Sequence, residues 1–197
     1  MTEPSLRERR RAETTVLVAE AALDLALEVG WDAVTVDDVA ARAGISRRTF
    51  FNYFATKDEA LFHNAMEWRP DVLAQFRASH EPLVDALEDL FLAQTSTEPH
   101  DRDRASQVLR LVEGSPELLP GLLTRIAAME DVLVEAITDR GDVDEFTART
   151  AAAIAGSLAR VSGLSWLSGL QPDPLTSTRA AWAALRSLTT ATDRSNA

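Results

Sequence analysis

Apolar residues recur every three or four positions through most of this chain, and no segment alternates apolar and polar residues in the two-residue period of a strand. Val18, Ala22, Leu25 and Val29 show the pattern clearly and predict an amphipathic helix over residues 8–29. Helices and strands bury their apolar side chains with different periods, so this spacing is the strongest constraint on the fold. We therefore predict an all-α protein with about nine helices.

Glycine and capping residues divide the next segment into two short helices. Gly30 is expected to end the first long helix in a left-handed conformation. Thr35 begins a T-x-x-D capping arrangement, and the helix after it stops at Gly44. Ser46 is expected to cap the following helix. Two short helices joined by a glycine-containing turn indicate a helix-turn-helix unit over residues 35–54.

Proline and glycine mark the ends of the later helices in the same way. Ser115 and Asp173 are expected N-caps, each followed by proline at the first helical position. Residues 97–101 are expected to form a loop. The predicted later helices span about 57–79, bent or broken near Pro70, then 82–96, 101–113, 115–140, 142–169 and 173–192.

Composition excludes several kinds of site. The 197 residues include no cysteine, so disulfides and thiolate metal sites are absent. The three histidines, His63, His80 and His100, have no partner at ligand spacing, and we expect neither a metal nor a cofactor. No enzyme or phosphate-loop motif occurs, which argues against an enzyme. No apolar run is long enough to span a membrane, and the arginine-rich start lacks a leader, so we expect a soluble cytoplasmic protein.

The net charge of −11 is distributed unevenly. Residues 1–57 hold eight Arg and Lys against nine Asp and Glu, whereas the remainder holds 12 against 22. The acidic excess therefore lies outside the predicted helix-turn-helix segment. Binding to DNA depends on the local potential within about 10 Å, so an acidic total does not exclude a DNA-binding surface on this segment.

The segment ISRRTFFNYFATK, residues 45–57, combines two arginines, four aromatic residues and the only lysine of the chain. Phe50 and Phe54 are four residues apart and share one helix face. We expect this face to be buried, with its neighbours drawn from the preceding helices. The expected neighbours are Leu25, Val36, Val39 and Ala40.

The opposite face of this segment carries groups that suit DNA. Arg47, Arg48, Phe51 and Asn52 point away from the buried rings, and these residue types pair with guanine, contact the thymine methyl group or pair with adenine. Tyr53 offers a hydroxyl to a phosphate. Thr35, Ser46 and Lys57 stand at helix N-termini, where backbone N–H groups and the helix dipole favour phosphate.

These residues also carry a family resemblance. The run GWDAVTVDDVAARAGISRRTFFNYFATKDEAL resembles the DNA-binding region of the TetR family of one-component regulators, and the match extends over residues 10–62. The chain departs from the family pattern at Phe51, where tyrosine is usual, and at Ala26, where an aromatic residue is usual. By position, the resemblance implies that Arg47, Arg48 and Thr49 contact bases and that Thr35, Ser46, Tyr53 and Lys57 contact phosphates.

The resemblance further implies an Ω-shaped homodimer with two domains. Residues 1–56 would form the DNA-binding domain, with its recognition helix at about 46–53, and residues 57–197 would bind a ligand and dimerise. The arginine-rich start, SLRERRRAE, is interpreted either as an arm that contacts DNA or as a disordered, solvated tail.

Large side chains in the second part are candidates for an apolar ligand pocket, although each is also a natural core residue. A loose likeness of residues 115–137 to TetR regulators that respond to acyl-CoA makes an acyl-CoA one candidate ligand. Arg110, Arg125 or Arg160 would then meet its phosphates or a carboxylate, although surface salt bridges are the preferred interpretation of these arginines. The pocket candidates are Phe62, Trp68, Phe76, Phe91, Leu109, Arg110, Met129 and Trp166.

Small residues in the last two helices permit close helix packing, either within one chain or across a dimer. The resemblance favours the dimer. The predicted interface residues are Ala152, Gly156, Ala159, Gly163, Ala181 and Ala184.

Together these features predict a sequence-specific DNA-binding transcriptional regulator. The main hypothesis is a repressor of a palindromic operator that a small hydrophobic ligand releases. The alternative is a ligand-independent DNA-binding protein, or an activator, with the same fold.

Overall fold

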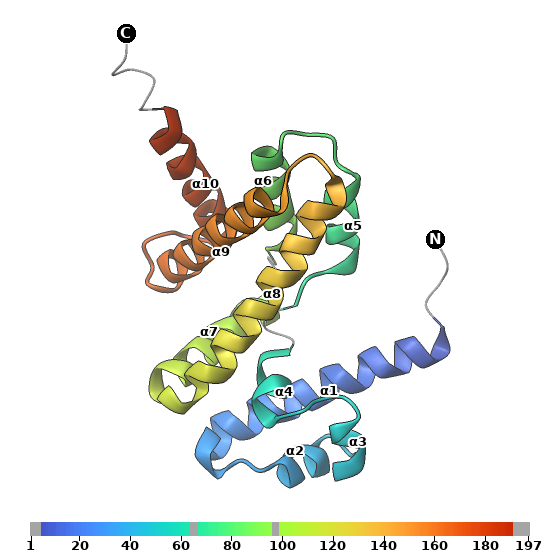
Figure 1. The fold of residues 1–197 in the computed structure, drawn as a ribbon. Coiled ribbons are helices and arrows are strands. Elements are labelled where there is room, and N and C mark those ends of the chain that lie inside the picture. Colours follow the sequence, from blue (N-terminus) through green and yellow to red (C-terminus); the bar gives the residue numbers. More distant parts are fainter. Residues whose placement is uncertain (1–4, 64–66, 96–98, 191–197) are drawn as a thin grey trace. The chain divides into compact units, whose positions relative to one another are not determined.

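The computed structural model describes residues 5–63, 67–95 and 99–190 (Figure 1). These residues form ten α-helices and two short 3₁₀-helices and contain no strand. The predicted all-α fold is confirmed, with one helix more than the approximate number expected, because residues 57–79 are divided into two helices ahead of Pro70. The helices are α1 (Leu6–Val29), α2 (Val36–Arg42), α3 (Arg47–Phe51), α4 (Lys57–His63), α5 (Pro70–Ala78), α6 (Leu83–Gln94), α7 (Pro99–Gly114), α8 (Leu119–Arg140), α9 (Glu145–Leu167) and α10 (Pro174–Thr190), with η1 (Trp31–Ala33) and η2 (Pro116–Leu118).

The arginine-rich start belongs to α1, which begins at Leu6. Its backbone is therefore helical from that residue onward, and the interpretation as a disordered tail is wrong for the described part. The Arg11 guanidinium lies 5.2 Å from the centre of the Tyr53 ring, so the start of α1 reaches the residues that follow α3.

Two predicted boundaries near the middle of the chain are wrong. Helix α7 begins at Pro99, inside the predicted loop 97–101, because proline is well suited to the first helical position. Ser115 makes no side-chain capping bond, since a 3₁₀ turn over Pro116–Leu118 comes between it and α8. Pro120 then falls in the first turn of α8, where its missing N–H costs no intrahelical bond.

The chain divides into two compact units, each with its own apolar core. The first unit comprises Met1–Glu67 and Asp103–Ala127, and the second comprises Trp68–Arg102 and Ala128–Ala197. Helix α8 begins in the first unit and ends in the second. The units do not coincide with a boundary at residue 56, because α4, the end of α7 and the start of α8 all pack with the N-terminal helices. The functional division at residue 56 remains a prediction.

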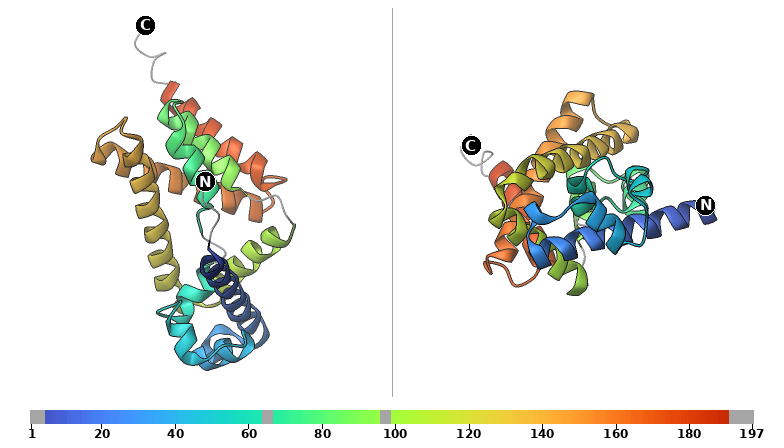
Figure 2. Two further views of the ribbon diagram at one scale, coloured as in Figure 1. Left: turned by 90° about the vertical axis from the view of Figure 1, so that its right-hand side faces the viewer. Right: turned by 90° about the horizontal axis from the view of Figure 1, so that it is seen from below.

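In the second unit, α9 and α10 pack along each other, and α5 packs beside α6 (Figures 1 and 2). The Phe91 ring contacts both the Trp68 ring and the Trp182 ring, with centres 5.3 and 6.0 Å away respectively. The Trp68 indole N–H donates to the carbonyl of Met129 at 3.0 Å. Arg186 of α10 forms ion pairs with two acids of α6, Asp85 and Glu88. These contacts join helices that lie far apart in the sequence.

Within the described residues, no helix is both long enough and apolar enough to cross a lipid bilayer. Nor do the described His, Asp and Glu side chains gather in any group of three or more that could hold a metal ion. His100 of the predicted histidine set lies outside the side chains that the structure describes.

Candidate nucleic-acid interface

The helix-turn-helix forms because its capping residues and glycines act locally. The Thr35 hydroxyl accepts from the Asp38 N–H at 3.2 Å, and the Asp38 carboxylate accepts from the Thr35 N–H at 3.0 Å, so the predicted capping arrangement is confirmed. A further hydrogen bond from the Thr35 hydroxyl lowers the pKa of Asp38. Gly44 adopts a φ of +69°, which turns the chain toward α3 without the strain that a Cβ would add. Ser46 caps α3 by accepting from the Thr49 N–H at 3.0 Å.

The two inward rings are buried as predicted. Phe50 has an exposed fraction of 0 % and Phe54 of 2 %, and both belong to the core of the first unit. The same core contains three of the predicted neighbours, Leu25, Val39 and Ala40, and the fourth, Val36, is partly buried against it. Trp31 and Ala26 are buried in this core as well. Helix α3, the predicted recognition helix, is therefore held against the core by Phe50 on the helix and by Phe54 just after it.

The outward residues of α3 are exposed as predicted. Arg47, Arg48, Phe51 and Asn52 all lie at the surface. Thr49 is half-buried, and its hydroxyl lies 2.8 Å from the hydroxyl of Ser46. The structure thus brings the predicted base-contacting residues together on one short helix and its C-cap.

The cations near this helix differ in what holds them. Arg42 forms a bidentate ion pair with Glu28, with N–O distances of 2.9 and 2.6 Å, and the hydrogen bond from Arg42 lowers the pKa of Glu28. Arg47 pairs with Asp37 at 2.7 Å. Within the described residues Arg48 has neither an ion pair nor a hydrogen bond from its side chain. Of the two arginines of α3, Arg48 is therefore the one with no partner among the described residues.

Lys57 has a structural role that the sequence did not indicate. Its ammonium donates to the carbonyls of Trp31 and Val34 at 2.9 and 2.7 Å and lies 4.5 Å from the centre of the Trp31 ring. These bonds attach the start of α4 to the segment before α2. An ammonium group has three donors, so one remains for the predicted phosphate contact.

Comparison with known proteins agrees with this geometry. Residues 18–63 match the model of the bacterial regulatory proteins of the tetR family, and residues 81–190 match the MftR C-terminal domain. A candidate mycofactocin biosynthesis transcriptional regulator, MftR of Mycobacterium tuberculosis, is 31 % identical over 154 residues, which cover 73 % of this chain and 75 % of that protein. The HTH-type transcriptional regulator TcmR of Streptomyces glaucescens is 31 % identical over 182 residues, 83 % of this chain and 77 % of that protein.

The chain belongs to the TetR family. It is accordingly a DNA-binding regulator of transcription, in a family of regulatory proteins whose members act as dimers. The crystal structure of a candidate TetR-family regulator from Rhodococcus sp. has the same fold, with a TM-score of 0.52 at 20 % identity, covering 89 % of this chain and 97 % of that one.

The structure separates the ligand-pocket candidates that the TetR resemblance suggested. Phe62, Leu109 and Arg110 belong to the first unit, whereas the other five belong to the second. Phe62 is fully buried in the core that supports α3, and Arg110 is exposed. Trp68 and Phe91 are engaged in the aromatic contacts described above. No single unit can therefore enclose the whole predicted set.

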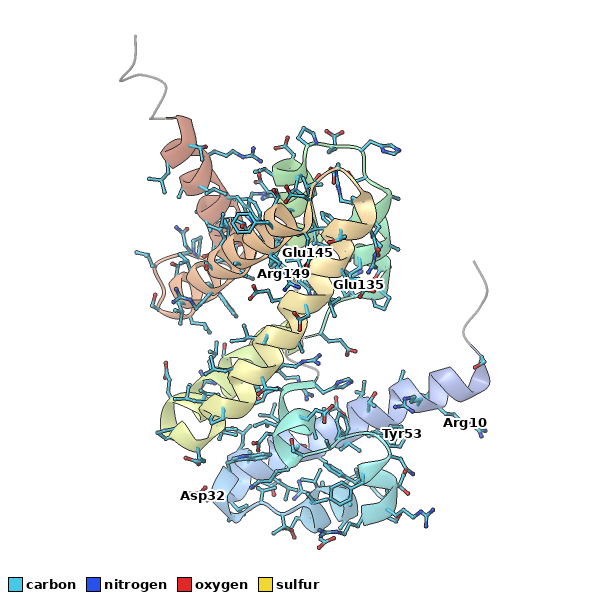
Figure 3. All side chains as sticks on the ribbon, in the orientation of Figure 1. Arg10, Asp32, Tyr53, Glu135, Glu145 and Arg149 are labelled. Carbon is cyan, nitrogen blue, oxygen red and sulfur yellow. The ribbon has the colours of Figure 1, made fainter. Side chains whose placement is uncertain are left out.

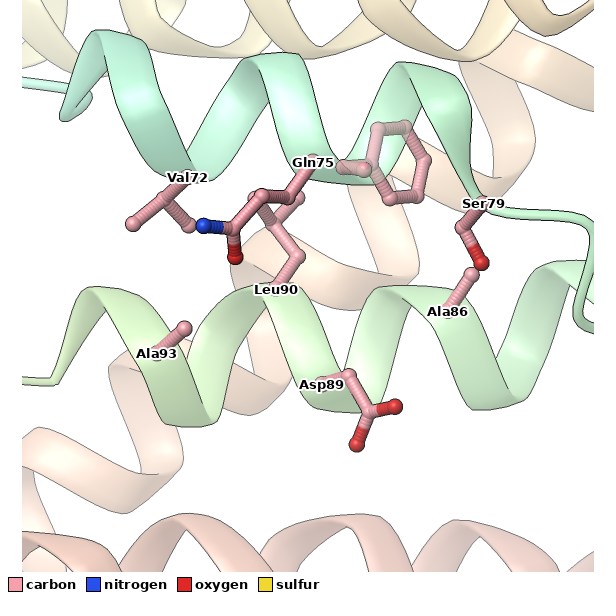
Figure 4. Close-up of a pocket in the computed structure, with 8 residues that line it drawn as sticks. Val72, Gln75, Ser79, Ala86, Asp89, Leu90 and Ala93 are labelled. Atoms are coloured by element: carbon pink, nitrogen blue, oxygen red, sulfur yellow. The ribbon is translucent and has the colours of Figure 1, made fainter.

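A small groove lies between α5 and α6 of the second unit (Figure 4). Its volume is about 200 Å³, and its polar groups are Gln75, Ser79 and Asp89. Among the predicted pocket residues it contains Phe76 alone. Ligand pockets commonly measure about 300–1,000 Å³, so this groove can hold only part of a drug-sized ligand.

The predicted TetR dimer residues lie on different sides of α9 and α10. Ala152 and Ala181 are buried inside the subunit, so in this structure they are not available to a partner, and for them the prediction needs correction. They contribute instead to packing within one chain. Gly156 and Ala184 are exposed, and Ala159 and Gly163 are half-buried.

Sequence reasoning missed the larger apolar residues on the opposite side of α9. Phe146, Ile154, Val161 and Leu164 are exposed, Phe146 by 81 %. They recur at intervals of three, seven and eight residues, facing away from the buried stripe of alanines. This second stripe was visible in the sequence as a helix with apolar residues on two faces.

Proposed function

We propose that this protein is a repressor that binds a palindromic operator as a homodimer and is released by a small hydrophobic effector. The observation that carries the proposal is the division of residues 47–54 into a buried side with Phe50 and Phe54 and an exposed side of arginine, asparagine and phenylalanine. A helix of this kind can enter the major groove while its rings remain in the protein core. Such a repressor would act in the cytoplasm.

The exposed residues have two roles in this proposal. Residues on α3 and its C-cap contact base edges, and residues at helix N-termini or beside them contact phosphates. Arg48 is the strongest base-contacting candidate because its guanidinium has no competing partner in the part of the chain that the structure describes. The proposed base contacts are Arg47, Arg48, Thr49, Phe51 and Asn52, and the proposed phosphate contacts are Thr35, Ser46, Tyr53 and Lys57.

The proposed dimer uses the exposed face of the last two helices. Ile154, Val161 and Leu164 supply apolar area, and Gly156 and Gly163 leave open space in which a partner helix can approach closely. An exposed glycine inside a helix costs about 1 kcal/mol and gains nothing within the subunit, which supports a role between subunits. Two recognition helices would then meet major grooves about 34–36 Å apart.

The effector would act by preferring one dimer conformation. A ligand shifts an equilibrium only by the difference between its affinities for the two states, so release requires tighter binding to the conformer with the wrong spacing. A hydrophobic effector suits the apolar second unit, with an acyl-CoA as one candidate. The α5–α6 groove offers a starting point of mixed apolar and polar lining.

A second candidate function is ligand-independent DNA binding, by a repressor or an activator. The α5–α6 groove, at about 200 Å³, is smaller than a usual ligand pocket, and this alternative requires no larger one. Titration of the protein–operator complex with medium-chain and long-chain acyl-CoAs tests the effector model for its first candidate. Saturable loss of operator affinity supports an acyl-CoA effector, and an operator affinity that no acyl-CoA changes excludes that candidate ligand.

The DNA-binding part is tested by selecting genomic fragments with the full-length protein and titrating the best fragment by fluorescence anisotropy. We expect log affinity to fall with log salt at a slope of about −0.9 per neutralised phosphate. Arg48→Ala should weaken binding to that fragment by about 1–3 kcal/mol and change binding to a scrambled duplex much less.

Arg149→Ala is the matched control, because Arg149 is an exposed arginine of α9 paired with Glu145 (Figure 3). This substitution removes the same charge at a position far from α3 in the sequence. It should change the affinity for the selected fragment and for the scrambled duplex by less than twofold, which is less than about 0.5 kcal/mol. A flat salt response, or equal losses from the two substitutions, contradicts the proposal.

A further inference from the structure

Two adjacent arginines at the start of α3 are held differently. One guanidinium nitrogen of Arg47 lies 2.7 Å from a carboxylate oxygen of Asp37, which belongs to α2. The same guanidinium lies 5.4 Å from the centre of the Phe51 ring, one turn further along α3. Arg48 has neither contact among the described residues. The ion pair and the ring thus restrain one arginine and leave its neighbour unrestrained.

The ion pair with Asp37 is not explained by the stability of the fold. The side chains of Arg47 and Asp37 are 58 % and 65 % exposed, and an ion pair this exposed contributes little to stability. Nor is Asp37 part of the capping arrangement, which uses Thr35 and Asp38. What the pair does determine is the direction of the Arg47 side chain, because one anchor is on α2 and the other is on α3.

The position of Asp37 also has a cost for DNA binding. Asp37 lies next to Asp38 in the first turn of α2, beside residues proposed to meet phosphates, so its negative charge disfavours every duplex equally. A carboxylate at such a surface can improve discrimination, because the cost is offset only on a sequence that lets the restrained arginine make a good contact. Restraint before binding also reduces the side-chain freedom that Arg47 loses in the complex.

We propose that Asp37 is a specificity-determining residue that positions Arg47 for one base pair of the operator. The inference rests on the proposed function and deepens it. Asp37 accepts one N–H of the guanidinium, and Phe51 lies against it, so the remaining N–H groups project in a fixed direction. Asp37 thereby lowers affinity for DNA in general and raises the ratio of operator to nonspecific affinity.

The test compares the operator fragment selected by the wild-type protein with a scrambled duplex of the same length. Asp37→Asn should raise affinity for the scrambled duplex several-fold and steepen its salt slope by up to about 0.9, because the freed arginine gains a phosphate. The ratio of the two affinities should fall by about fivefold or more, since a well-placed bidentate contact contributes about 1–3 kcal/mol of discrimination.

Asp32→Asn is the control for charge alone. Asp32 is exposed on η1 and, within the described residues, makes no ion pair or hydrogen bond through its side chain. Figure 3 shows it at the opposite end of the N-terminal helices from Tyr53. Its substitution should change both affinities in parallel and leave their ratio unchanged. If Asp37→Asn behaves in the same way, Asp37 does not position Arg47 and the inference is overturned.

A double-mutant cycle decides whether Asp37 acts through Arg47. In the Arg47→Ala background, Asp37→Asn should no longer lower the affinity ratio. A loss as large as in the wild-type background overturns the inference even if the single mutant behaves as expected. Failure of the wild-type protein to select any fragment would instead refute the proposed function, so the two failures are distinguishable.

Discussion

The helix-turn-helix segment and the α9–α10 pair differ in how clearly residue chemistry separates the buried face of a helix from its exposed face. In α3 the two faces differ in chemistry, with Phe50 inside and Arg48 outside. In α9 both faces carry apolar or small residues, with Ala152 inside and Val161 outside. A chemical contrast between faces specifies burial within one chain. When both faces of a helix are apolar or small, the residue types do not indicate which face is buried. The elements that pack against the helix, including those of a second subunit, then determine it.

The two regions also differ in what they leave exposed to solvent. The helix-turn-helix closes its own helix ends through Thr35 and Ser46 and leaves mainly charged and polar groups at its surface. The α9–α10 pair leaves Phe146 and Leu188 exposed by 81 % and 73 %. Large exposed apolar side chains that recur along one helix indicate a surface for a partner. The exposed apolar stripe of α9 is therefore the surface that we expect a partner to cover.

The sharpest way to break this comparison is to truncate adjacent rings of α3. Phe50→Ala should lower the unfolding free energy of the first unit by about 3–5 kcal/mol because it leaves a cavity in a closed core. Phe51→Ala, the matched control, should lower it by less than about 1 kcal/mol because that ring is exposed. Hydrogen exchange of the first unit measures both values. Equal losses would mean that the two faces of α3 are not distinct.

The next test concerns the exposed face of α9. Val161→Glu should raise the dissociation constant of the dimer roughly a hundredfold, because symmetry places two unpaired charges in one apolar interface. Ala74→Glu adds the same charge at an exposed position of α5 and should leave the constant unchanged. Sedimentation equilibrium measures both. A dimer that tolerates Glu at position 161 does not use this face.

Alanine substitutions at two glycines, one in each unit, test the same comparison through smaller changes in stability. A Cβ on Gly156 would meet nothing within 4 Å, so Gly156→Ala should stabilise the second unit by about 1 kcal/mol under conditions where the protein is monomeric. A Cβ on Gly121 would lie 2.9 Å from the Asp58 Cβ, so Gly121→Ala should destabilise the first unit by about 1–3 kcal/mol. Urea unfolding at low protein concentration should therefore give opposite signs, and equal signs would contradict the packing described for Gly121.

The smallest expected effect is the acid sensitivity of the α2 cap. Hydrogen bonds from Thr35 lower the pKa of Asp38 below its ordinary value of 3.8, so the folded protein keeps this carboxylate ionised to a lower pH than the unfolded chain does. The stability that Asp38 contributes is therefore complete above pH 3.8 and is lost as the pH falls through the lowered pKa.

Unfolding of wild type and Asp38→Asn between pH 7 and pH 3 checks this sign. The two proteins should differ most near neutral pH and converge in acid. Asp32→Asn provides the comparison for an exposed carboxylate without a hydrogen bond among the described residues. A difference between wild type and Asp38→Asn that grows toward low pH would contradict the assignment.

Much of the helix-turn-helix could be predicted because its causes are local. Thr35, Gly44 and Ser46 act within three or four residues along the chain, and Phe50 and Phe54 are one helical turn apart. What could not be predicted depends on distant partners. The Lys57 ammonium donates hydrogen bonds to the carbonyls of Trp31 and Val34, which lie 26 and 23 residues earlier, and no local sequence pattern predicts these bonds.

The ligand-pocket candidates are divided between the two units for the same physical reason, and a pocket formed by them stays a prediction. The apolar chemistry of a large side chain such as Phe62 predicts that it will be buried. It does not predict which residues will surround it. Phe62 joined the core beneath α3, whereas Phe91 joined the rings of Trp68 and Trp182.

The sequence by itself determined the helical class, the positions of most helix ends, and the two faces of α3, because periodicity, caps and glycine turns act over a few neighbouring residues. Only the tertiary structure decided that Arg47 is held while Arg48 is unengaged, and that Ala152 faces inward while Val161 faces outward. These distinctions depend on contacts between segments that the chain brings together only when it folds. Two residues of the same type are equivalent in a sequence until such a contact separates them.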